Sequence, residues 1–196
     1  METNSHWKKF MLNPAEYLAG SMGLLVGFIG MLITVLAGYY TRGHLDGVVD
    51  MHLGKQFSLL AQTEEVFLVW IITFLALFIS AKIISKTSFR IIDLLGTLAI
   101  ARIPLILLLP ISYFCVPSEE VLKKLTDTSH QIAFSEVAPL LVIGIVSFVF
   151  IAWVCVLMYN AFCTSCNVKG KNALISFIIA MLAAEILSKI IFRYIF

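Results

Sequence analysis

Hydrophobic residues are gathered into five long runs, and polar segments separate one run from the next. A helix rises about 1.5 Å per residue, so about 20 apolar residues cross the hydrocarbon core of a bilayer. None of the runs shows the ten-residue alternation of apolar and polar positions that is typical of membrane strands. The pattern therefore predicts an all-α polytopic transmembrane helical bundle. Its five spans are expected at about residues 18–39, 66–84, 91–115, 137–159 and 173–196.

Composition supports the same interpretation. Hydrophobic residues make up 60% of the 196 residues and charged residues only 13%. Soluble domains are usually about 45–50% apolar and about 25% charged, so the expected partner of this surface is the lipid bilayer. The net charge of +2 is small, and the basic residues lie in short flanks without forming a patch, which argues against nucleic-acid binding. We expect a single transmembrane domain, residues 1–196, with residues 1–17 as an interfacial N-terminal segment anchored by Trp7.

The connecting segments predict the orientation, because Lys and Arg are enriched in short cytoplasmic loops. With the N-terminus inside, the inner segments carry Lys8, Lys9, Lys82, Lys86, Arg90, Lys169 and Lys171. The outer loops then carry Arg42, Lys55, Lys123 and Lys124. Five spans place the C-terminus outside. The outer segment 116–136 is polar and acidic, and a short surface helix is expected within it at 118–125.

Glycines mark one face of the first span. Steps of three and four residues put four of them on the same side of a helix, and one pair has the small-xxx-small spacing that lets helix backbones approach closely in lipid. Packing against another helix of the same chain is the expected use of this face, and homodimerisation is the alternative. The four residues are Gly20, Gly23, Gly27 and Gly30.

Charged residues inside the spans are the main functional candidates, because burying a charge in a bilayer is costly. Counted from the inner side, Arg102 lies about 17 Å deep in the third span and Glu185 about 18 Å deep in the fifth. The matching depths predict that these two side chains pair near the midplane. Lys189 follows Glu185 by one helical turn and is expected to share it. The cluster is either a structural ion pair or a proton or ion relay.

Two further residues shape the third span. Asp93 lies near its inner end, on the opposite helix face from Arg102. It is expected to meet Lys82, Lys86 or Lys171, or to act as a first-turn acid favoured by the helix dipole. Pro104 lacks a backbone donor, so the span should kink near residues 100–102.

The sequence contains no recognised catalytic or cofactor-binding motif. Cys163 and Cys166 form a C-x-x-C without a second ligand pair, so free thiols are expected there instead of a zinc site. The outer loop carries possible metal ligands that we expect to be solvated and metal-free: His44, Asp46, Asp50 and His52. No enzymatic activity, cofactor or metal is therefore expected.

Three stretches together resemble the Yip family. They are Trp7-Lys8-Lys9 with Leu12-Asn13-Pro14, the segment from Asp93 through Gly96 and Arg102 to Pro104, and Tyr159-Asn160-Ala161-Phe162 with Lys169-Gly170 behind it. The chain is identified as a bacterial member, whose eukaryotic relatives are Rab-GTPase-interacting membrane proteins of the early secretory pathway. The resemblance implies five spans with the N-terminus in the cytosol, here in the bacterial cytoplasmic (inner) membrane. Only about 17 residues precede the first span, and the Tyr-Gly motif of the eukaryotic members is missing, so the resemblance does not extend to Rab binding.

Two functions follow as hypotheses. The first is a non-enzymatic scaffold that organises the membrane through helix packing and partner binding, either as a homo-oligomer or with another membrane protein. The second is a small transporter or channel that uses Arg102, Glu185 and Lys189 as a relay, with Asp93 at the inner mouth. Whether water reaches Glu185 separates the two.

Overall fold

The computed structural model describes residues 9–115 and 134–195. A short 3-10 turn, η1 (Pro14–Glu16), precedes α2 (Gly20–Thr41), and the hairpin strands β1 (Gly43–His44) and β2 (His52–Leu53) follow. The remaining elements are α3 (Leu59–Ile84), α4 (Ile91–Ala101), α5 (Leu105–Cys115), α7 (Phe134–Cys166) and α8 (Gly170–Ile195). The surface helix expected at 118–125 and the Trp7 anchor lie outside the described residues.

Within the described ranges, five helical segments are long and apolar enough to cross a membrane: Gly20–Thr41, Leu59–Ile84, Ile91–Cys115, Val137–Cys166 and Gly170–Ile195. The predicted all-α bundle of five spans is therefore confirmed, and the protein is an integral membrane protein. The second span begins earlier than predicted, because α3 starts seven residues before Val66, and α7 continues seven residues beyond the predicted end at Tyr159. Ser58 caps the extension of α3 by accepting a hydrogen bond from the Ala61 N–H at 3.1 Å, as is typical of helix N-caps.

The third span is broken in the middle, as Pro104 predicts. Helix α4 ends at Ala101 and α5 begins at Leu105. The N–H of Arg102 turns to the Ala99 carbonyl at 3.2 Å, which is a 3-10 contact. Proline removes the donor that would continue the α-helix. The break places Arg102 between the two halves of the span.

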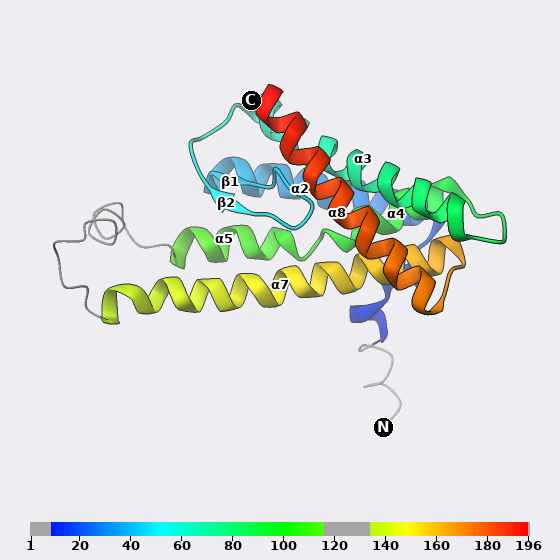
Figure 1. The fold of residues 1–196 in the computed structure, drawn as a ribbon. Helices are drawn as coiled ribbons and strands as arrows, with labels where there is room; N and C mark the ends of the chain where they lie inside the picture. Colours follow the sequence, from blue (N-terminus) through cyan, green and yellow to red (C-terminus); the bar gives the residue numbers. More distant parts are fainter. Residues whose placement is uncertain (1–8, 116–133, 196) are drawn as a thin grey trace.

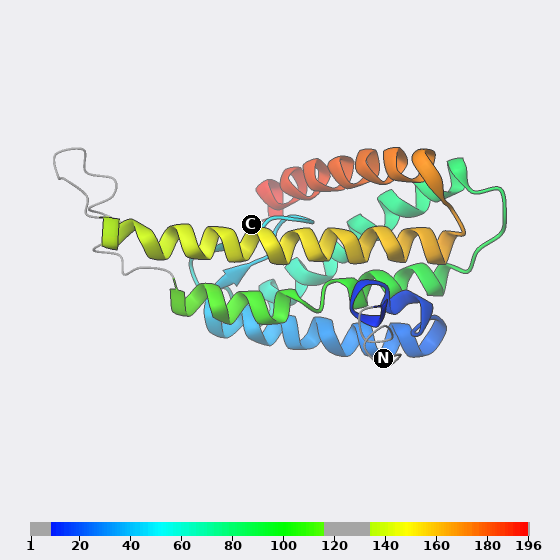
Figure 2. The ribbon, with the colours of Figure 1, turned by 90° about the horizontal axis from the view of Figure 1, so that it is seen from below.

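The helices run lengthwise between two ends of the bundle (Figures 1 and 2). The α3–α4 and α7–α8 connections lie together at one end, which we name the basic end because Lys86 and Lys169 lie there. The α2–α3 connection leaves from the opposite end, the hairpin end. The η1 turn lies towards the basic end and the C-terminus towards the hairpin end, so the odd number of spans separates the two termini.

Helix packing places the third span at the centre. Helix α4 packs against α2 and α7, and α8 packs against α3. In the most apolar stretch of the third span, 67% is buried, whereas in the corresponding stretch of α7 only 17% is. Helix α7 therefore lies at the periphery, with most of its apolar surface open to lipid.

The N-terminal residues are fixed to α7. Trp153 donates its indole N–H to the Met11 carbonyl at 2.9 Å, and the Asn160 amide donates to the Leu12 carbonyl at 2.7 Å. These bonds hold residues 11–13 across α7 near the basic end. The placement suits a segment that lies along the membrane interface.

Candidate functional site

The β1–β2 hairpin turns back alongside α2 and inserts among the helices (Figure 1). It pairs Gly43 with Leu53 and His44 with His52. The hairpin begins where Arg42 ends α2 in the left-handed conformation, with φ of 57°. Its residues Leu45 and Val48 are 1% and 2% exposed. Irregular backbone at this depth needs partners from the protein, because lipid offers no hydrogen bonds.

Glu65 of α3 supplies the first of these partners. Its carboxylate accepts the Leu45 N–H and also contacts Nδ1 of His44 at 3.0 Å. The other ring nitrogen of His44 contacts the Lys55 carbonyl at 2.8 Å. Both Glu65 and His44 are buried, at 1% and 3% exposed. The hydrogen bond to Glu65 raises the pKa of the His44 imidazole above its ordinary value, although burial acts in the opposite direction.

Glu185 of α8 supplies the second partner. Its carboxylate accepts hydrogen bonds from the N–H groups of Val48 at 2.7 Å and Val49 at 3.1 Å. Gly47 lies directly against the same carboxylate, where a Cβ atom would collide with it. Glu185 therefore holds the tip of the hairpin from a position 137 residues further along the chain.

The prediction that Arg102 and Glu185 pair directly is wrong. Arg102 is 2% exposed, and none of its three guanidinium nitrogens has a hydrogen-bond partner among the described residues. Glu185 and Glu65 are its electrostatic neighbours without a bond to it. The depths match, but the Glu185 oxygens are directed to the hairpin backbone.

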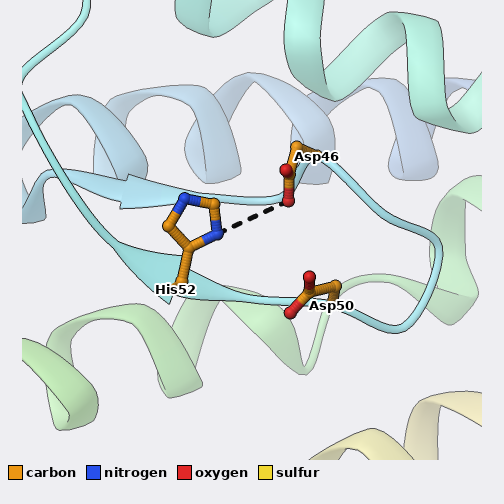
Figure 3. Close-up of side chains that lie close together, drawn as sticks. All are labelled: Asp46, Asp50 and His52. Atoms are coloured by element: carbon orange, nitrogen blue, oxygen red, sulfur yellow. Dashed lines mark ion pairs between the residues drawn. The ribbon is translucent and has the colours of Figure 1, made fainter. Parts of the chain in front are cut away.

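Lys189 also differs from the expectation. It pairs with Asp46 at 2.9 Å and with Asp50, both in the hairpin, instead of sharing Glu185. His52 pairs with Asp46 at 3.5 Å, as Figure 3 shows. Ligand atoms of Asp46, Asp50 and His52 lie within 4.8 Å of one another, a spacing suited to a metal ion. Lys189 already pairs with both carboxylates, so a metal ion would have to displace it.

A cavity of about 340 Å³ lies beside this cluster. Its lining combines groups from the hairpin, α3 and α8, including His44, Asp46, His52, Lys55, Glu65 and Lys189. The polar groups of the hairpin end therefore converge on one space. The contacts of His44 and Glu65 with backbone groups of the hairpin and of Lys55 suit an anchoring role.

Asp93 lies apart from this cluster. It occupies the first turn of α4, and its carboxylate accepts the Gly20 N–H at 2.8 Å. Asp93 therefore has the expected role of a first-turn acid in α4, and it also caps the start of α2. Among the described residues, no ion pair joins Asp93 to Lys82, Lys86 or Lys171.

The glycine face of the first span packs against α4. All four glycines are buried: Gly20, Gly23, Gly27 and Gly30. A Cβ atom at Gly27 would lie 3.0 Å from both the Gly96 carbonyl oxygen and the Ile100 nitrogen. Because α4 covers this face, it is not available to a second copy of the chain.

Cys163 and Cys166 are free thiols.

Sequence reasoning missed Glu65 and His44 as partners. The predicted span at 66–84 leaves both residues in the outer loop, because hydropathy alone starts the second span at Val66. The N-cap signal of Ser58 was the available clue, since it places Glu65 two turns inside a helix. Nothing in the local sequence indicates that β1 lies against that turn.

Comparison with known proteins places residues 4–190 in the family model described as Yip1 domain. No curated protein matches the chain, and no solved structure does.

Proposed function

The chain belongs to the Yip1-domain family, and from this we propose that it is a non-enzymatic, multi-pass membrane protein that organises the membrane through helix packing and partner binding. We place it in the bacterial cytoplasmic membrane, with its N-terminus inside. The observation that carries this proposal is the use of the intramembrane carboxylates. Glu65 and Glu185 bind the backbone of the hairpin, which is a structural role.

The peripheral helix α7 offers the surface for partners. Its exposed apolar side chains recur along one side of the helix, for example Leu141, Ile145 and Phe148. Apolar surface of this kind contacts either lipid or another membrane protein. The glycine face, by contrast, is occupied within the chain.

One observation favours the transporter alternative. A buried guanidinium without a hydrogen-bond partner is costly, and such groups mark ion pathways in many membrane proteins. Arg102 has this property. Loss of the Glu185 charge near Arg102 should therefore lower stability if the protein is a scaffold, and should abolish ion flux if it is a transporter.

The first experiment compares Glu185→Gln with the wild type for thermal stability in detergent and for proton or ion flux in liposomes. Glutamine keeps a single neutral acceptor, so the bonds to Val48 and Val49 should lose about 1–3 kcal/mol. We expect a clear fall in Tm and no flux from either protein. The control is Glu64→Gln, which removes the same charge from an exposed position on α3. Wild-type flux that disappears in a Glu185→Gln protein of normal stability would overturn the proposal.

The second experiment tests partner contacts. A photo-crosslinking residue at Phe148, which is 73% exposed on α7, should capture a second copy or one defined membrane protein in native membranes. The same probe at Ile186, which is 61% exposed on α8, serves as the comparison. Lipid adducts alone at both positions would contradict the partner role of α7.

A further inference from the structure

Two cavities meet at the seam between α3 and α8. The first, of about 510 Å³, lies at the basic end, and its polar lining includes Lys86, Thr87, Asn167, Lys169 and Asn172. The second, of about 580 Å³, is an apolar groove between the two helices. Ile83 lines both, so the polar cavity lies directly beside the groove.

The polar cavity has the chemistry of an anion site. Lys86 and Lys169 come from the two connections that meet at this end, and Asn167 is positioned by a bond from its amide to Thr87 Oγ1 at 3.2 Å. No ion pair involves Lys86 or Lys169 among the described residues. Basic cavities between membrane helices on the cytoplasmic side bind anionic lipid headgroups.

The groove has the shape of a site for an acyl chain. Small residues form its floor, among them Ala76, Ala180 and Ala184, and larger side chains such as Ile79 and Ile179 form its rim. Ser80 donates to the Ser176 carbonyl at 3.2 Å, which fixes the two helices to each other there.

The length of the groove agrees with one leaflet. On α3 its lining extends from Ile83 back to Ile72, and on α8 from Ser176 to Leu187. Each stretch covers about 16 Å at 1.5 Å per residue, which is close to half of a hydrocarbon core about 30 Å thick. A polar, basic cavity at the end of the bundle thus adjoins an apolar groove about as long as one leaflet is thick.

We infer that the α3–α8 seam is a binding site for one anionic glycerophospholipid, with its phosphate between Lys86 and Lys169 and one acyl chain in the groove. Charge complementarity selects an anionic headgroup over a zwitterionic one. The apolar groove beside the cavity selects a lipid over free phosphate. A second copy of the chain would fill the groove but would leave the basic cavity without an anion.

The test titrates the purified protein in detergent with dioleoylphosphatidylglycerol and follows Tm and lipid adducts in native mass spectrometry. Dioleoylphosphatidylcholine tests the charge, and glycerol 1-phosphate tests the headgroup without chains. We expect phosphatidylglycerol to raise Tm, phosphatidylcholine to raise it less, and glycerol phosphate to leave it unchanged. Equal effects of the two lipids, or a full effect of glycerol phosphate, would overturn the inference.

Variants locate the site. Replacing both lysines in Lys86→Gln/Lys169→Gln should weaken phosphatidylglycerol binding about 30-fold, because each lysine near an anionic headgroup is worth about fivefold in affinity. Lys171→Gln is the matched control, since Lys171 lies at the same end but not in the lining of the polar cavity. Equal affinities of the double variant and this control would contradict the site.

The groove is tested by Ala183→Phe, which fills it, against Ala152→Phe on the exposed side of α7. We expect only the first to reduce the number of retained lipids. If Ala183→Phe instead converts a dimer into a monomer and lipid binding is unchanged, a second copy occupies the groove and the inference fails.

Discussion

The carboxylate of Asp93 accepts the backbone N–H of Gly20 at 2.8 Å, although 73 residues separate them. Gly20 is the first residue of α2 and has φ of 64°. No side-chain cap comes from its own segment, since Ala19 holds the N-cap position. A residue of α4 therefore performs the capping of α2, and the same contact fixes the register of the two helices.

We predict that Asp93→Ala destabilises the protein by about 1–2 kcal/mol, as expected for the loss of a helix cap. Asp93→Asn should cost less, because its carbonyl oxygen still accepts the bond. Thermal unfolding in detergent measures both, with Glu64→Ala as the exposed acidic control. Equal Tm values for the alanine and asparagine variants would show that the charge, and not the hydrogen bond, is what matters at this position.

The glycine face of α2 gives a second prediction. Alanine at Gly27 would place a Cβ atom 3.0 Å from the Gly96 oxygen, so α2 and α4 must move apart. The cost of overpacking, about 1–3 kcal/mol, exceeds the helix-propensity gain of about 1 kcal/mol. Gly27→Ala should therefore lower Tm.

Gly144 of α7 is the matched control for Gly27. A Cβ atom there meets nothing within 4 Å, so Gly144→Ala should keep the propensity gain and leave Tm unchanged or slightly higher. If both substitutions shifted Tm equally, close packing of α2 on α4 would not be what this glycine provides.

These contacts show what the sequence could and could not predict. Hydropathy located the five spans, and the spacing of Gly23 and Gly27 identified the face of α2, because both signals are local. The Arg102–Glu185 pair failed because depth along a helix says nothing about direction. Arg102 lies within the break of its span, and the Glu185 oxygens bind the hairpin. The hairpin itself depends on residues far along the chain, which no local pattern reveals.

The cluster around Lys189 predicts the response to metal ions. Lys189 pairs with Asp46 and Asp50, but its side chain is 39% exposed, so these pairs contribute less than about 1 kcal/mol. Lys189→Met should lower Tm less than Glu185→Gln does. With Lys189 in place, added Zn²⁺ or EDTA should leave the wild-type Tm unchanged.

Removal of Lys189 uncovers the ligand atoms of Asp46, Asp50 and His52, which lie within 4.8 Å of one another. The Tm of Lys189→Met should therefore rise on addition of Zn²⁺, and the further change His52→Gln should reduce the rise. A Zn²⁺-dependent rise in the wild type would mean that Lys189 does not exclude cations.

The His44–Glu65 contact predicts a dependence of stability on pH. Because the folded state raises the pKa of His44 above 6.5, protonated His44 favours folding. This stabilisation is fully present below pH 6.5 and is lost as the pH rises through the raised pKa. Thermal unfolding measured from about pH 5.5 to about pH 9 should show Tm falling across that window. In His44→Gln this fall should be absent, whereas Glu64→Gln should retain it. A Tm that rises through the same window in the wild type, or an identical fall in His44→Gln, would show that this histidine does not hold the hairpin through its charge.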